Sequence, residues 1–248
     1  MFSALTPGER IWLIALLALW AALLFGGFLF GRPHASPPQR MPTWARLGSS
    51  LTLAAAAWSW VAFAGAGTPR IVALLIAIGM TLGCLGDVLL AEIAPLAQPL
   101  IAGMAAFGLG HLAYIAALII AGNVDNLTAV GLRWGALAVW LVIGVAGWYA
   151  VVMRGHSATL IQYAALPYTL LLASVTGLAW GLALQSGAYW AVAVGATLFL
   201  ASDLILAAQT FQGLRFQMIG DLIWLTYGPG QMLVVYGMGA ALLSIGVR

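Results

Sequence analysis

Charged side chains are scarce in this chain of 248 residues. Only 6% of its residues are Asp, Glu, Lys or Arg, whereas 64% are hydrophobic, and a soluble domain carries about a quarter charged residues. A soluble core could not bury this much apolar sequence. The composition therefore excludes a soluble globular protein and predicts an all-α polytopic membrane protein, because a helix satisfies its own backbone hydrogen bonds in lipid.

Lysine is absent, and cysteine occurs only once. The single cysteine, Cys84, excludes a disulfide framework and a metal–thiolate site. All nine basic residues are Arg, and a net charge of +3 on so few charges gives no indication of nucleic-acid binding. The chain contains no Gly-x-Ser-x-Gly elbow, no Walker motif and no His-Glu-x-x-His motif. We expect no cofactor, no bound metal and no nucleic-acid partner.

Long apolar runs dominate what is present. Eight of them approach the roughly 20 residues that cross a bilayer. The connection Gly31–Arg46, rich in Pro and Arg, is expected to be an exposed loop, and the other connections are short. Short connections make neighbouring helices pack antiparallel, which predicts one integral membrane domain over residues 1–248 built as a single bundle of eight helices. The predicted spans are 11–30, 47–64, 71–91, 99–121, 131–152, 158–184, 187–208 and 219–246.

Two of these runs carry an aspartate within the same local pattern. Residues 82–91 and 198–207 both read Leu-x-x-x-small-Asp-apolar-apolar-Leu-Ala, with Asp87 and Asp203 at the acidic position. An acid inside a span costs roughly 2.5–3.5 kcal/mol on insertion scales, so we take the pair as the functional centre. The two lie 116 residues apart (203 − 87), each on the third span of a four-helix half. This spacing is consistent with a 4+4 parallel internal repeat, with chance similarity between apolar segments as the alternative.

The polar residues inside the spans share one half of the bilayer. We call the side that bears the loop Gly31–Arg46 side B. Both aspartate-bearing spans run towards side B, which places the acids roughly 6–10 Å below that surface, and His111 lies roughly 16–18 Å in, with Tyr227 and Gln231 at a similar depth. We also expect no Arg within the spans to pair with the acids. These positions predict a site that opens towards side B.

Two close carboxylates in an environment of low dielectric constant cannot both ionise easily, so one keeps its proton. One proton donor beside one anion is what acid/base catalysis needs, and it is equally what a proton-coupled carrier needs. For His111, Tyr114 and Gln231 the alternative is an ordinary hydrogen bond between helices. A metal site made of His111 and the two aspartates is a further alternative.

At these residues the chain resembles the YhhN family, whose animal members are lysoplasmalogenases. The resemblance runs from about residue 70 to the end and fits the order of the motifs and the eight-span architecture. Two features depart from the family's Ala-rich pattern, namely Gly110 and the Gly228-Pro229-Gly230 sequence, which we expect to interrupt and kink the last span. The matching segments are Gly86–Leu90, Phe107–Tyr114, Ser202–Ala207 and Tyr227–Leu233.

The resemblance implies hydrolysis of the vinyl ether bond of lysoplasmalogens to a fatty aldehyde and a glycerophospho-ethanolamine or -choline. It implies that Asp87 and Asp203 act as acid and anion in an order that the sequence leaves open, with His111 orienting or relaying. The expected partners are a lysophospholipid substrate and membrane lipids. The residues expected to bind water, the glycerol oxygens or the phosphate are Tyr114, Ser202, Tyr227, Gln231 and Arg215.

The alternative function is a small proton-coupled transporter or lipid carrier that uses the same buried acids. The balance of Arg residues, five in side B loops and four on the opposite side, predicts side B in the cytoplasm and both termini outside. We expect a multi-pass protein of the cell inner membrane, and the sequence leaves its oligomeric state open.

Overall fold

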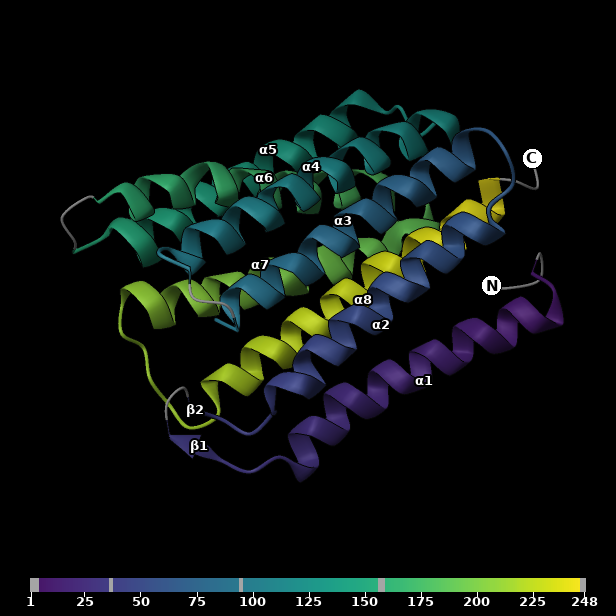
Figure 1. Ribbon diagram of the computed structural model, residues 1–248. Helices are drawn as coiled ribbons and strands as arrows, with labels where there is room; N and C mark the ends of the chain where they lie inside the picture. Colours follow the sequence, from purple (N-terminus) through teal and green to yellow (C-terminus); the bar gives the residue numbers. More distant parts are fainter. Residues whose placement is uncertain (1–4, 36–37, 94–95, 156–158, 246–248) are drawn as a thin grey trace.

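The computed structural model describes residues 5–35, 38–93, 96–155 and 159–245, and they form a bundle of eight long helices (Figure 1). The all-α class is confirmed, and each predicted span corresponds to one helix; the predicted ends at residues 158 and 246 lie outside the described residues. The only strands in the described part of the chain form a two-residue antiparallel ladder, β1 (His34–Ala35) with β2 (Pro38–Gln39). The helices are α1 (Pro7–Phe30), α2 (Thr43–Phe63), α3 (Thr68–Leu90), α4 (Pro99–Val124), α5 (Val130–Trp148) continued by the π-helical turn η1 (Tyr149–Met153), α6 (Leu160–Ala183), the 3₁₀ turn η2 (Gly187–Tyr189), α7 (Trp190–Phe211) and α8 (Ile219–Ile245).

Six helices in the described chain are long and apolar enough to cross a membrane: α1, α3, α4, α5 with η1, α6, and α7 with η2. The protein is therefore a multi-pass helical membrane protein. Helices α2 and α8 are not among the six. The first half of α2 is polar for a membrane helix, since it carries Arg46, Ser49, Ser50 and Thr52.

The two helices that carry the aspartates, α3 and α7, both pack against α8. Helix α8 packs against α7, α3 and α2, α3 packs against α4 and α2, and α6 packs against α4, α5 and α7. Helix α1 lies at the edge of the bundle and contacts chiefly α2 (Figure 1). Helix α1 begins and α8 ends at the same end of the bundle, as an even number of long helices requires.

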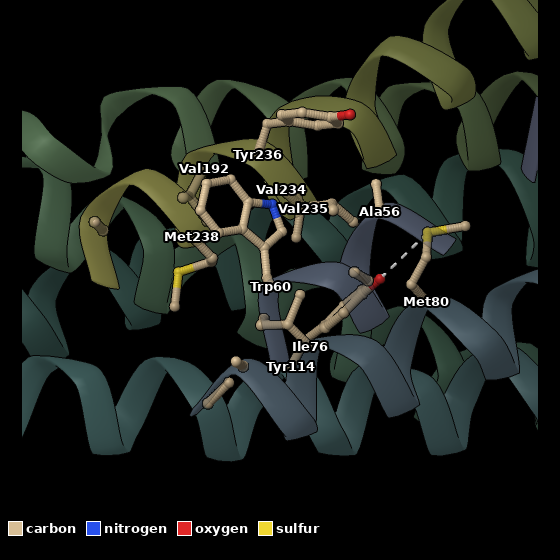
Figure 2. Close-up of a cluster of buried hydrophobic side chains, with 14 of the residues drawn as sticks. Ala56, Trp60, Ile76, Met80, Tyr114, Val192, Val234, Val235, Tyr236 and Met238 are labelled. Atoms are coloured by element: carbon tan, nitrogen blue, oxygen red, sulfur yellow. Dashed lines mark hydrogen bonds between the residues drawn. The ribbon is translucent and has the colours of Figure 1, made fainter. Parts of the chain in front are cut away.

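A buried hydrophobic cluster fills the half of the bundle away from side B. It joins Trp60 of α2, Met80 of α3, Tyr114 of α4 and Tyr236 of α8 (Figure 2). Trp60 and Tyr236 pack edge to face with ring centroids 6.4 Å apart, and the hydroxyl of Tyr114 lies 3.9 Å from Met80 Sδ. This part of the bundle is thus held together by aromatic and aliphatic packing.

Two pairs of glycines bring the acid-bearing helices into backbone contact with their neighbours. A Cβ added at Gly110 of α4 would lie 2.9 Å from the carbonyl oxygen of Gly79 on α3, and one at Gly230 of α8 would lie 2.8 Å from that of Gly195 on α7. The predicted interruption of the last span is wrong, because α8 continues through Pro229. The glycines around this proline allow close helix packing instead of ending the helix.

The loop before α2 is shorter than predicted, and it is held in place by an acid. Helix α2 begins at Thr43, so Arg46 lies on its first turn and not in the loop. Asp221, on the first turn of α8, accepts hydrogen bonds from the backbone N–H groups of Arg40 and Met41 at 2.6 and 2.8 Å. This buried carboxylate therefore has a structural function, since it fixes the chain that leads into α2.

Candidate functional site

A cavity of about 240 Å³ lies at the side B end of the bundle. It is bounded by the segments where α2, α4, α6 and α8 begin and where α3, α5 and α7 end. Both Asp87 and Asp203 line it, and most of the remaining lining is apolar. The expectation that the intramembrane acids meet at a site towards side B thus agrees with this geometry.

Asp87 is a hydrogen-bond acceptor held from two other helices. Its side chain is only 5% exposed. Oδ2 accepts from the hydroxyl of Ser50 on α2 and from the hydroxyl of Tyr227 on α8, the latter at 3.0 Å. Both bonds fall on one oxygen, which leaves Oδ1 available to a bound water or substrate.

The proton of Tyr227 is directed towards Asp87 by a chain of hydrogen bonds. The hydroxyl of Tyr114 donates to Gln231 Oε1 at 3.0 Å, and Gln231 Nε2 donates to the hydroxyl of Tyr227 at 3.4 Å. Because an amide nitrogen can only donate, the Tyr227 oxygen accepts from Gln231, and its own proton is left to point at Asp87. Tyr114 and Gln231 therefore act through Tyr227 and are positioning residues.

Asp203 has a different environment. Its Oδ2 accepts from the hydroxyl of Tyr168 on α6, and its Oδ1 lies 3.3 Å from the hydroxyl of the neighbouring Ser202. Asp203 lines the same cavity as Asp87. The two carboxylates are thus unequal, since Asp87 has two donors on a single oxygen and Asp203 has one donor on each.

An aromatic cluster forms the apolar wall beside Asp87. The ring of Tyr227 packs edge to face against Phe199 at 5.1 Å, Trp224 at 5.3 Å and Phe107 at 6.0 Å between centroids. Gly86, next to Asp87, makes room for this wall, because a Cβ there would lie 2.5 Å from the Phe107 ring. The wall limits the access of water from the bundle interior.

The predicted site residues divide into two groups. Those on the cavity are Asp87, Asp203, Ser202 and Tyr227, and those outside its lining are His111, Tyr114, Gln231 and Arg215. Tyr114 and Gln231 remain connected to Asp87 through the hydrogen bonds above. Arg215 is exposed in the connection between α7 and α8.

His111 is separated from the acid pair. Its ring lies among aromatic side chains, 5.1 Å from Phe199 and 5.5 Å from Tyr168 between centroids. Both ring nitrogens are buried, and neither has a hydrogen-bond partner among the described residues. Within the same residues no three His, Cys, Asp or Glu side chains lie close enough to hold a metal ion, so the geometry does not support a metal site of His111 with the two aspartates.

Sequence reasoning missed three residues at this site: Arg46, Ser50 and Tyr168. Arg46, which the sequence analysis assigns to the loop before the second span, lies on the first turn of α2 and lines the cavity together with both acids. The Pro42-Thr43 pair was the available signal, because Pro is common at a helix start and would have placed Arg46 on the first turn. Ser50 and Tyr168 are each one of several hydroxyl-bearing residues on α2 and α6, and nothing in the sequence singles them out.

The family model for the YhhN family matches residues 43–238, which include all of α2 to α7 and most of α8. The chain belongs to the YhhN family. No curated protein and no solved structure matches it significantly. The match covers every residue of the acid pair and of its hydrogen-bond partners, so the site described above belongs to the part of the chain that defines the YhhN family.

Proposed function

We propose that this YhhN-family protein is an integral-membrane hydrolase that cleaves the vinyl ether bond of lysoplasmalogens. The observation that carries the proposal is the presence of two carboxylates, from α3 and α7, on one largely apolar cavity within the side B half of the bundle. Glycosidases, whose reaction also passes through an oxocarbenium ion, use a similar pair of acids.

The reaction needs a proton donor, an anion and a water molecule. Protonation of the β-carbon of the double bond leaves an oxocarbenium ion at the α-carbon. Water adds to that carbon and loses a proton, and the resulting hemiacetal collapses to a fatty aldehyde and the glycerol hydroxyl of the glycerophospho compound. The net change is the addition of one water and the cleavage of one carbon–oxygen bond.

The hydrogen bonds suggest which acid has which task. Asp87 is the anion, because its two hydroxyl donors both come from other helices and meet on Oδ2, whereas one of the two donors to Asp203 is the adjacent Ser202, at 3.3 Å. Asp203 is the acid that protonates the double bond. Asp87 then stabilises the oxocarbenium ion and accepts a proton from the attacking water. Tyr227 and Ser50 hold the anion in place, and Ser202 lies beside the acid.

Release of product without a membrane tests this function. Purified protein in detergent is expected to convert a lysoplasmalogen to fatty aldehyde, which a coupled aldehyde-reducing enzyme detects. The alternative, a proton-coupled transporter or lipid carrier, would show no turnover where no gradient exists. Absence of aldehyde from folded wild-type protein, with lysoplasmalogens of both head groups, would overturn the proposal.

We also propose that all eight helices cross the cell inner membrane and that the chain is two four-helix halves. The close glycine contacts support this, since Gly79 and Gly195 lie 116 residues apart (195 − 79), as do the two aspartates, and Gly110 and Gly230 lie 120 apart (230 − 110). The helix contacts repeat in the same way. In two four-helix halves α4 corresponds to α8 and α6 to α2, and α4 contacts α6 as α8 contacts α2. In this arrangement each half supplies one acid to the cavity between them.

A further inference from the structure

One cation lines the cavity together with the acids. Arg46 lies on the first turn of α2, where it donates a hydrogen bond to the hydroxyl of Thr43 at 3.1 Å. Its guanidinium carbon lies 5.5 Å from the centre of the Trp224 ring. These two contacts fix the position of the guanidinium at the side B end of the cavity, which Gln39 also lines.

The donors of this guanidinium are not used up within the described chain. Nε of Arg46 is buried and has no hydrogen-bond partner among the described residues. The carboxylates whose charges reach Arg46 are Asp87 and Asp221. Asp221 uses both of its oxygens on the backbone N–H groups before α2, and Asp87 takes its hydrogen bonds from Ser50 and Tyr227. Arg46 is thus a partly desolvated cation with hydrogen bonds still to make.

We propose that Arg46 binds the phosphate of a single-chain glycerophospholipid and so places the lipid in the cavity with its first chain atoms beside the acids. Arg suits this task because its planar fork makes two parallel hydrogen bonds to a phosphate. The amino end of α2, which has an uncapped N-cap at Pro42 and no acidic residue in its first turn, adds the favourable end of a helix dipole. The proposal rests on the proposed function for the identity of the lipid.

Helix geometry places the phosphate and the reacting bond at a suitable separation. Arg46 and Ser50 are four residues apart on α2, so they share a face and lie about 6 Å apart along the helix axis. Ser50 holds Asp87 directly. A three-carbon glycerol unit spans a comparable distance between its phosphate and its ether oxygen. A lipid anchored at Arg46 would therefore present its ether bond at the level of the two carboxylates.

The size and lining of the cavity favour one chain. Its volume of about 240 Å³ is below the roughly 300–1,000 Å³ of typical ligand pockets, which leaves room for a head group and the first part of one chain. Much of the lining is apolar, with residues such as Leu90, Leu100, Met104 and Leu172. A second acyl chain on the glycerol would have no place there.

Binding of an uncleavable lipid tests the proposal independently of catalysis. The main probe is a saturated 1-O-alkyl glycerophosphocholine, which has no vinyl ether bond. The comparison probes are the same alkylglycerol without phosphate and glycerol 3-phosphate without the chain. Affinity is measured in detergent from the change in tryptophan fluorescence, since Trp224 lines the cavity, and from the shift in melting temperature.

Wild-type protein is expected to bind the phosphate-bearing lipid more tightly than either partial probe. Arg46→Gln should lower the affinity for the phosphate-bearing lipid by about 10–100-fold, which is the effect of losing charge-assisted hydrogen bonds. The affinity for the alkylglycerol should not change. Arg46→Lys should give an intermediate loss, because Lys keeps the charge without the fork. Arg154→Gln, at an exposed position on the same side, is the charge-matched control and should bind as the wild type does.

Three results would overturn the proposal. If Arg46→Gln weakens the binding of both lipids equally, Arg46 supports the fold or the charge of Asp87 and does not bind a phosphate. Wild-type affinity in Arg46→Gln means that no anion binds there, and a loss confined to Arg215→Gln moves the head-group site to the α7–α8 connection. If Arg46→Gln does not fold, Arg46→Lys and the wild-type preference for phosphate still decide the question. Since no probe is hydrolysed, these outcomes are independent of whether aldehyde is released.

Discussion

Replacing Tyr227 by Phe tests whether the hydrogen bond to Asp87 contributes to the reaction. The substitution removes one of two donors to Oδ2, at 3.0 Å in the structure, and keeps the ring packed against Phe199 and Trp224. A hydrogen bond to a charged group is worth about 1.5–3 kcal/mol. At about 1.4 kcal/mol for each factor of ten in rate, kcat for aldehyde release should fall about 10–150-fold.

The variant should also lose some stability, because the change leaves Gln231 Nε2 without its acceptor, and an unsatisfied buried donor costs about 1–3 kcal/mol. Tyr236→Phe is the matched control. It lies on the same helix, is similarly buried, and donates its hydroxyl hydrogen bond to the carbonyl of Leu13 at 2.8 Å, away from the cavity. The control should lower the melting temperature and leave kcat unchanged.

The assay compares initial rates of aldehyde release and melting temperatures for the three proteins in one detergent. If Tyr227→Phe keeps wild-type kcat while its melting temperature falls, the bond from Tyr227 to Asp87 is only structural. If Tyr236→Phe slows the reaction as much as Tyr227→Phe does, the rate reflects general loosening of α8. In either case the assignment of Asp87 as the stabilised anion would have to be abandoned.

Three further predictions concern the acids, the glycine contacts and the membrane orientation. Asp87→Asn and Asp203→Asn should each lower the rate of aldehyde release by more than about 10²-fold while the protein still folds. The wild-type rate should have a bell-shaped pH profile that reports the pair. A folded Asn variant with more than roughly a tenth of the wild-type rate contradicts the role of that acid. Gly230→Ala should destabilise the protein by about 1–3 kcal/mol, because its Cβ would lie 2.8 Å from the Gly195 carbonyl oxygen. Gly131 has open space around it, so Gly131→Ala should not alter the melting temperature by more than the error of the measurement. Reporter fusions at either end of the chain should be active outside the cytoplasm, and cytoplasmic activity would reverse the predicted orientation.

The helices could be predicted almost entirely from the sequence. Long apolar runs separated by short connections define each helix to within a few residues. Several helices also begin with Pro in their first turn. At α1, for example, Thr6 and Glu9 form a capping box directly before the apolar run. Hydropathy alone is a weaker guide at α2, because its polar start makes the helix begin earlier than the apolar run does.

The acid pair could be predicted for a similar reason, since a carboxylate in an apolar run stands out. Its partners could not. Ser50 and Tyr168 come from helices remote in the sequence, and their hydroxyls become significant only because packing brings them to Asp87 and Asp203. For His111 the residue type and the depth in the span predict catalysis. The structure packs its ring against Phe199 and Tyr168, with no hydrogen-bond partner for either ring nitrogen among the described residues, so its catalytic role stays a prediction.

The Gly-Pro-Gly segment shows why local rules alone can mislead inside a bundle. Proline removes one backbone donor, which in an isolated helix favours a break. In α8 the neighbouring helices compensate, since Gly228 accommodates Leu24 of α1 and Gly230 accommodates α7. The glycines that weaken the helix locally allow the contacts that stabilise it globally, and this balance depends on tertiary packing.

Helix α1 lies at the edge of the bundle and takes no part in the cavity. None of the cavity-lining residues in the described chain comes from α1, and the family match begins at residue 43, the first residue of α2. The helices from α2 to α8 alone therefore carry the acids, the tyrosines and Arg46, and they would start at the side B end, while α8 ends at the opposite end. Helix α1 thus returns the chain across the bundle without contributing to the chemistry.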